Sequence, residues 1–178
     1  MFDNAKKLGA LLTQRGLTMA VAESCTGGMI GAAITRVPGS SAYFKGGVIA
    51  YSNEIKEQVL GVPRELLETK GAVSGEVVKA MAQGVAKLCK SSCSIAVSGI
   101  AGPQGGSADK PVGLVFIGIY LKDKVQSFTF NFAGDRERVR KEATKAGLEK
   151  MMEALRSSPP KPPSSGVSKG LPQGEFPL

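Results

Sequence analysis

Short apolar segments typical of strands alternate with amphipathic segments typical of helices along this chain, and this alternation restricts the fold more than any other feature. The predicted helices cover residues 3–16, 29–37, 53–60, 74–90 and 134–155. The predicted strands cover residues 18–22, 43–51, 94–98, 112–120 and 125–132, with a short hairpin turn between the last two. Ser52 or Asn53 can cap the third helix, and Ser74 can cap the fourth. We therefore predict a single three-layer α/β/α sandwich with a mixed, mostly parallel sheet and an antiparallel hairpin.

The composition changes after Arg156. Residues 157–178 are rich in Pro, Gly and Ser, and such a segment buries too little apolar surface to offset the entropy lost on ordering. We predict one domain over residues 1–156 and a disordered tail over residues 157–178. No apolar run reaches the ~20 residues that span a membrane, and the N-terminus makes a poor signal peptide. We therefore expect a cytoplasmic protein that does not bind a membrane.

The chain is basic, with a formal net charge of +8 and a pI near 9.5. Clustered positive charge would indicate a nucleic-acid partner, but here the charges are scattered. The densest stretch, residues 136–145, is interrupted by Glu137 and Glu142, and the chain contains no Trp for base stacking. A nucleic-acid partner is not favoured, because an anionic small molecule explains the charge equally well.

The chain contains no histidine. A Ser-His-Asp triad, a Cys-His pair and the usual zinc hydrolase sites all need imidazole as base or ligand, so these chemistries are excluded. The three cysteines offer no plausible ligand set, and we expect neither a metal nor a cofactor. If this chain is a hydrolase, its base must be Lys, Tyr or a carboxylate.

Four segments rich in glycine, hydroxyl and cationic residues occur where predicted strands meet loops. They are residues 23–28, 38–43, 51–56 and 98–110. In open α/β sheets such loops converge on one crevice, so we expect the site there. The glycines of residues 99–106 follow neither the Walker nor the Rossmann spacing, which leaves a backbone anion nest as the alternative.

Two cationic features stand out near these loops. Lys56 follows Tyr51 closely, and a lysine can act as a base if its pKa is lowered, with a nearby Tyr to relay protons. The structural alternative is that Lys56 is an ordinary exposed helix residue without a role in catalysis. Arg136 and Arg140 lie near a helix start, where arginine does not favour the dipole, so they can serve as a phosphate clamp. The structural alternative for that segment is that Asp135 simply caps the helix.

Seven ordered motifs closely resemble the CinA C-terminal domain family, the nicotinamide-nucleotide amidases, in its stand-alone form. They are residues 22–28 (AESCTGG), 39–44 (GSSAYF), 51–53 (YSN) with 56, 71–74 (GAVS), 98–103 (SGIAGP), 110–113 (KPVG) and 134–136 (GDR). The resemblance covers roughly residues 5–153. It implies metal-free hydrolysis of the carboxamide of nicotinamide mononucleotide (NMN) to nicotinate mononucleotide and ammonia. It also implies a homo-oligomer.

The resemblance places the active site, by position, at Ser24, Ser41, Tyr51, Lys56, Ser98 and an arginine near Arg136; some relatives have Thr at the position of Ser98. Combining both lines of reasoning, we predict that Ser41 attacks the amide, with Lys56 and Tyr51 as base and proton relay and with Ser24 as the alternative nucleophile. The predicted substrate contacts are Thr26, Gly27, Gly28, Ser98, Gly99, Gly102, Gly105, Gly106, Arg136 and Arg140. The alternative function is a non-catalytic nucleotide or nucleic-acid binding module linked to competence.

Overall fold

The computed structural model describes residues 2–158, and this part of the chain contains six α-helices and five strands. The helices are α1 (Phe2–Arg15), α2 (Met29–Thr35), α3 (Asn53–Gln58), α4 (Arg64–Thr69), α5 (Gly75–Cys89) and α6 (Arg136–Ser157), with one 3₁₀ turn, η1 (Ser40–Ala42). The strands are β1 (Met19–Glu23), β2 (Phe44–Ile49), β3 (Cys93–Gly99), β4 (Leu114–Leu121) and β5 (Lys124–Asn131). Of the predicted tail, residues 157–178, Ser157 is the last residue of α6, and residues 159–178 lie outside the described residues.

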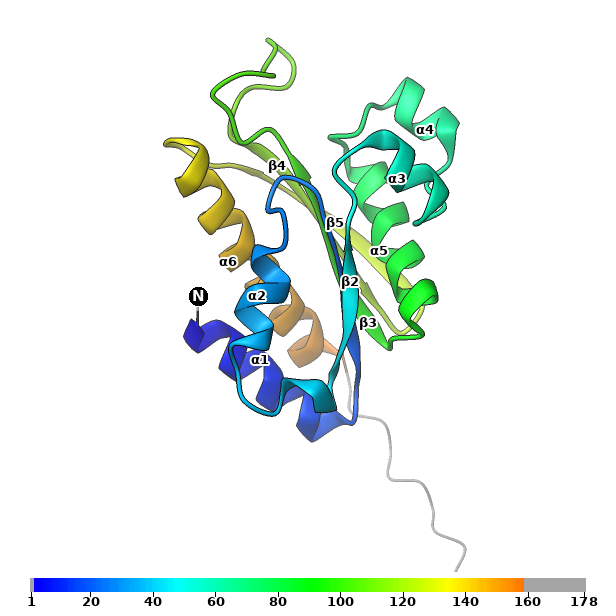
Figure 1. Ribbon diagram of the computed structural model, residues 1–178, viewed down its shortest axis with the longest axis vertical. Coiled ribbons are helices and arrows are strands. Elements are labelled where there is room, and N and C mark those ends of the chain that lie inside the picture. The colour runs from blue at the N-terminus through cyan, green and yellow to red at the C-terminus, as the bar shows by residue number, and fades with distance from the viewer. Residues whose placement is uncertain (1, 159–178) are drawn as a thin grey trace, which may run out of the picture.

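The five strands form one mixed sheet in the order β2-β1-β3-β4-β5 (Figure 1). Strand β1 pairs in parallel with β2 and β3, whereas β4 runs antiparallel to both β3 and β5. Four strands therefore point in the same direction, and β4 alone is reversed. The predicted α/β class, mixed sheet and hairpin are confirmed.

Helices cover both faces of the sheet, as Figure 1 shows. Helices α1, α2 and α6 pack on one face, and α5 packs on the other with α3 and α4 beside it. Each face has its own apolar core: one includes Leu8, Ile34 and Leu148, and the other includes Val78 and Met81. No helix within residues 2–158 is long and apolar enough to cross a membrane.

The sequence prediction missed α4. The helix begins directly after Pro63 and buries Leu67. Proline is common where a helix starts, and Leu66 and Leu67 supply a short apolar face, so the signal was present but brief. The helix matters because it leads into residues 71–74, part of which walls the cavity described below.

Helix α5 lies so close to the chain after α3 that only glycine fits at position 84. A Cβ built on Gly84 would overlap the backbone carbonyl of Leu60. We expect Gly84→Ala to destabilise the protein by about 1–3 kcal/mol, lowering the Tm by roughly 3–10 °C, as thermal unfolding would measure. The control is Gly31→Ala in α2, where the nearest atom, Glu23 Oε1, would be 3.6 Å from the new Cβ. That variant should have an equal or higher Tm, and a wild-type Tm for Gly84→Ala would contradict the close approach.

Candidate active site

The carboxyl ends of β1, β2 and β3 meet at one edge of the sheet, because these three strands are parallel. Ser24 follows β1 directly, and Tyr51 follows β2 by two residues. Ser98 is the second-last residue of β3. These residues line a cavity of about 240 Å³ together with Lys56 and Arg136. The expected convergence on one crevice therefore holds for the loops that follow strands.

Lys56 is the largest fully buried side chain of the described residues, at 1% exposure. Helix α3 begins at Asn53, where the Ser52 hydroxyl accepts a hydrogen bond from the Ile55 N–H at 3.2 Å, and Lys56 turns inward from the first turn. Its Nζ lies 3.3 Å from Ser24 Oγ. Two backbone carbonyls, those of Ala50 at 2.8 Å and Tyr51 at 3.2 Å, also accept hydrogen bonds from Nζ.

Burial of Lys56 makes its neutral amine easier to form than that of an exposed lysine. Burial lowers the pKa of Lys56, and the effect of the neighbouring Cys25 opposes that shift. A neutral amine has two hydrogens and one lone pair. The carbonyls of Ala50 and Tyr51 can take the two hydrogens, which leaves the lone pair directed at the Ser24 hydroxyl. The arrangement is therefore suited to removing a proton from Ser24.

Cys25 also lines the cavity. Its thiol is a second candidate nucleophile near Lys56, besides the Ser24 hydroxyl. Burial raises the pKa of the Cys25 thiol to about 11. Since the thiolate is the reactive form of cysteine, this thiol is inert near neutral pH.

This leads to a prediction that separates the two neighbouring nucleophiles. Cys25→Ala should keep turnover at this site within about threefold of wild type, and iodoacetamide should not inactivate the wild-type protein at pH 7, because the thiol is protonated and buried. Steady-state kinetics before and after alkylation would measure both. A 100-fold loss in Cys25→Ala at unchanged Tm would assign the chemistry to the thiol instead.

Tyr51 and Arg136 form one wall of the cavity. The Tyr51 hydroxyl accepts a hydrogen bond from Arg136 Nη2 at 3.0 Å, and Arg136 Nη1 donates to the Gly102 carbonyl at 2.9 Å. Tyr51 is 61% exposed. Its hydroxyl thus faces Arg136 and only its backbone carbonyl contacts Lys56, which does not match the predicted proton relay.

Ser98 and Gly99 form the floor at the end of β3. The Ser98 hydroxyl is buried and donates to the Ala72 carbonyl at 2.8 Å. Because its hydrogen is engaged there, Ser98 can only accept a hydrogen bond from a ligand.

Ser41 does not join these residues. It is exposed in η1, before β2 begins, whereas Lys56 follows the end of β2 (Figure 1). The six residues of β2 separate the two by roughly 20 Å at ~3.3 Å per residue. This corrects the predicted pairing of Ser41 with Lys56: the loop before a parallel strand lies at the opposite edge of the sheet from the loop after it.

Several predicted substrate contacts also lie outside the cavity. Arg140 donates to the backbone carbonyls of Cys25 and Thr26 rather than facing the cavity. Thr26 is fully buried, and its hydroxyl has no partner among residues 2–158. Gly27 and Gly28 continue that loop toward α2, while Gly105 and Gly106 are exposed in the loop between β3 and β4 and do not line the cavity either.

Two residues of the motifs described above lie at or near the site but were not among the predicted site residues. Asn53 lines the cavity. Glu23, the last residue of β1, is 1% exposed, and its carboxylate accepts hydrogen bonds from three backbone N–H groups at the start of α2. The sequence signal for Glu23 was a carboxylate at the end of an otherwise apolar buried strand, a position where an acidic residue is rare unless its charge is paired.

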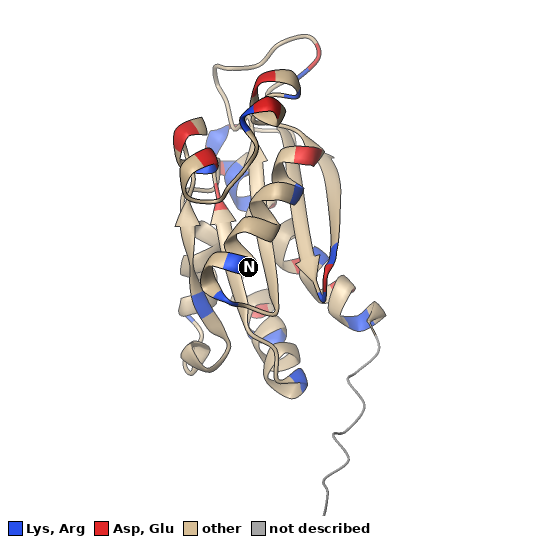
Figure 2. Ribbon diagram, turned by 90° about the vertical axis from the view of Figure 1, so that its right-hand side faces the viewer, with Lys and Arg blue, Asp and Glu red and all other residues tan. Residues whose placement is uncertain are grey.

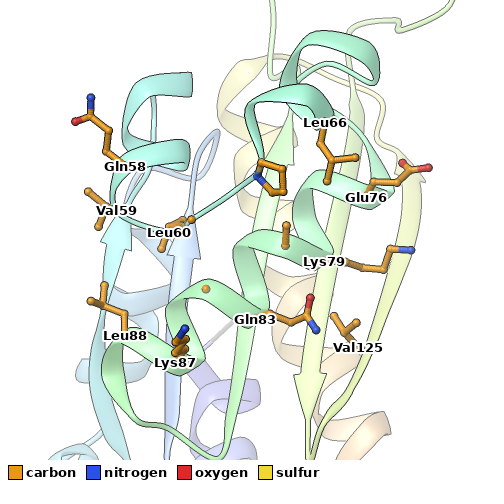
Figure 3. Close-up of a pocket in the computed structure, with 14 residues that line it drawn as sticks. Gln58, Val59, Leu60, Leu66, Glu76, Lys79, Gln83, Lys87, Leu88 and Val125 are labelled. Carbon is orange, nitrogen blue, oxygen red and sulfur yellow. The ribbon is translucent and has the colours of Figure 1, made fainter.

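A larger hollow of about 940 Å³ lies elsewhere, on the outer side of α5 (Figure 3). Its lining includes Leu60, Leu66, Gln83 and Leu88. It contains no buried nucleophile and no convergent set of buried polar groups. The chemistry therefore points to the smaller cavity at the strand ends.

Charged residues are distributed over many elements. In Figure 2, Lys and Arg are spread over helices, strands and loops and are interspersed with Asp and Glu. Within the part of the chain that the structure describes, no group of three or more acidic or cysteine side chains could hold a metal ion. Neither observation singles out a nucleic-acid surface or a metal centre.

The fold and the site together define a three-layer α/β/α protein with a buried lysine hydrogen-bonded to a serine at the strand ends. The sequence matches the CinA C-terminal domain over residues 2–155, and the chain belongs to that family.

Relatives and solved structures agree with this assignment. A CinA-like protein of Endomicrobium trichonymphae is 52% identical over 157 residues, which are 86% of this chain and 37% of that protein. A CinA-like protein of Geotalea daltonii is 48% identical over 152 residues, 85% of this chain and 37% of that protein. This chain thus spans about a third of the length of these curated relatives.

Two solved structures have the same fold over nearly their whole length. The competence/damage inducible protein CihA of Agrobacterium tumefaciens has a TM-score of 0.84 and 38% identity, covering 87% of this chain and 94% of that one. The competence damage-inducible protein A (ComA) of Klebsiella pneumoniae has a TM-score of 0.85 and 34% identity, covering 88% and 97%.

Proposed function

We propose that this chain hydrolyses the carboxamide of NMN to nicotinate mononucleotide and ammonia, with Ser24 as nucleophile and Lys56 as base. The observation that carries the proposal is the buried Lys56 Nζ, 3.3 Å from Ser24 Oγ and hydrogen-bonded to two backbone carbonyls. Serine with a neutral lysine supplies the base that a chain without histidine needs. The substrate is the one implied by the sequence resemblance.

The reaction runs in two halves. Ser24 Oγ attacks the amide carbon while its proton passes to Lys56 Nζ, and the resulting ammonium then protonates the departing nitrogen, which leaves as ammonia. Water next attacks the acyl-serine ester with Lys56 again taking the proton, and the nicotinate carboxylate is released. Ser24 and Lys56 return to their starting states, so no external reductant, oxidant or metal is needed.

Other groups around the cavity would bind the nucleotide and stabilise charge. We assign the oxyanion to backbone N–H groups of a glycine-rich loop at the strand ends, where each preorganised donor typically contributes about 3 kcal/mol. The exposed ring of Tyr51 offers a stacking surface for the pyridine. Arg136, which donates to the Tyr51 hydroxyl, would bind the phosphate.

The experiment that tests the proposal is ammonia release from NMN by the purified full chain. We expect turnover that persists in excess chelator, with nicotinate mononucleotide as the second product by chromatography. Binding without turnover would instead support the alternative, a non-catalytic module linked to competence. The alternative is favoured by the basic charge of the chain and by the competence-related names of the two solved structures, which describe those proteins.

Arg136 provides a separate prediction about the phosphate. Arg136→Ala should raise KM for NMN by about 10- to 100-fold while changing kcat less, since a lost charge-assisted hydrogen bond costs about 1.5–3 kcal/mol. The same variant should be assayed with nicotinamide riboside, which lacks the phosphate. An equal loss of kcat/KM on both substrates would count against a phosphate contact and would indicate that Arg136 acts through Tyr51 or the Gly102 loop.

A further inference from the structure

The segment that carries Ser24, residues 24–28, has little conformational preference of its own. We call it the nucleophile loop; it links β1 to α2 and consists of Ser, Cys, Thr and two glycines. Gly27 and Gly28 have φ values of 58° and 98°, in the region that favours glycine. Glycines add backbone freedom, so contacts from outside the loop must fix its conformation.

Glu23 ties the end of the loop and the start of α2 together through backbone N–H groups. Its Oε2 accepts hydrogen bonds from Gly28 N at 3.0 Å and Ile30 N at 3.1 Å, and its Oε1 accepts from Gly31 N at 2.8 Å. These bonds satisfy donors at the start of α2 that have no partner within the helix. A buried carboxylate with three such bonds is engaged as an acceptor and is not available as a base for Ser24.

Arg140 holds the same loop through backbone carbonyls. From α6, its Nε donates to the Cys25 carbonyl at 3.1 Å and its Nη2 donates to the Thr26 carbonyl at 2.9 Å. A Cβ added at Gly27 would lie 3.3 Å from Nη2, so the loop runs directly against the guanidinium. The planar fork of arginine can hold two carbonyls in fixed directions, which a lysine ammonium does less well.

We infer that Glu23 and Arg140 are positioning residues that hold the nucleophile loop from its two sides and so keep Ser24 Oγ within reach of Lys56 Nζ. Ser24 itself is tied by its N–H to the Val97 carbonyl at 3.0 Å, and its own carbonyl accepts from Gly27 N at 3.1 Å. Neither Glu23 nor Arg140 lines the cavity. The inference rests on the proposed Ser24–Lys56 chemistry, and it assigns Arg140 to the loop rather than to phosphate.

The test compares Arg140→Met and Arg140→Lys with Lys141→Met. Lys141 is the next residue on α6, its side chain is 57% exposed, and its removal deletes the same single charge. We expect Arg140→Met to lower kcat for NMN by about 10- to 100-fold, since small displacements of a reacting group cost that much, with KM within about twofold of wild type. Arg140→Lys should recover part of the loss, and Lys141→Met should match wild type.

Amide hydrogen exchange of the full chain, without substrate, supplies the second readout. In Arg140→Met we expect faster exchange confined to residues 25–31, and the same local change in Glu23→Gln, which retains only one carbonyl-type oxygen. Wild-type kcat in Arg140→Met, a KM increase at unchanged kcat, or exchange accelerated across the whole sheet would each overturn the inference. If the wild type releases no ammonia from NMN, the proposed function fails, and the exchange data alone then test whether Glu23 and Arg140 hold the nucleophile loop. Faster exchange confined to residues 25–31 would support that role, and unchanged exchange would overturn it.

Discussion

Ser24→Ala is expected to lower kcat for ammonia release from NMN by about 10³-fold or more, because loss of a nucleophile removes the covalent route and leaves only binding and oxyanion stabilisation. Ser24 is 8% exposed, and the change deletes one oxygen from the cavity, so the fold should be kept. Binding of nicotinate mononucleotide by calorimetry should remain within a few-fold of wild type. Steady-state kinetics and trapping of an acyl-enzyme by mass spectrometry would measure the effect.

Ser41→Ala is the matched control for this prediction. It makes the same substitution in an exposed serine at the opposite edge of the sheet, and we expect wild-type kinetics. If Ser24→Ala were active and Ser41→Ala inactive, the nucleophile would be Ser41, and a second copy of the chain would have to bring it to Lys56.

Replacement of Lys56 should have a comparable effect. Lys56→Met removes the amine and Lys56→Arg keeps a positive charge, but a guanidinium does not deprotonate in proteins. We expect both variants to lose about 10³-fold in kcat, within the range attributed to general bases, while Lys79→Arg on α5 should match wild type. A Lys56→Arg protein with near wild-type turnover would show that only the charge is needed.

The pH dependence gives an independent check on the same residue. Lys56 must be neutral to accept the Ser24 proton, and burial lowers its pKa below the ordinary 10.5. The rate should therefore rise with pH through the lowered pKa and level off above it, and it should fall on acidification through that pKa. A kcat/KM profile that did not fall on acidification would contradict a lysine base.

The sequence predicted most of the fold because the signals for its elements are local. The helix caps show this well: Ser52, Ser74 and Asp135 each accept a hydrogen bond from a backbone N–H three residues later, as expected for N-cap residues. Short apolar runs likewise located the five strands of residues 2–158. Helix α4 was missed because it has only six residues, which are too few to show the apolar repeat of a helix.

The site was predicted less completely, since its geometry depends on contacts between distant parts of the chain. Whether a loop lies at the carboxyl or the amino edge of the sheet depends on strand order and direction, and this is why Ser41 was grouped with Lys56. The role of Arg140 depends on contacts with residues 25 and 26, more than 110 positions away. No spacing rule connects residues so far apart.

Besides the Ser24 hydroxyl, the amine of Lys56 is held by two main-chain oxygens, the carbonyls of Ala50 and Tyr51. Every residue type has such a carbonyl, so mutations at these two positions need not dislodge the lysine. The Tyr51 side chain takes no part in these bonds and is 61% exposed. Under the proposed function, substitutions of that side chain can therefore change substrate preference while the Ser24–Lys56 pair is kept.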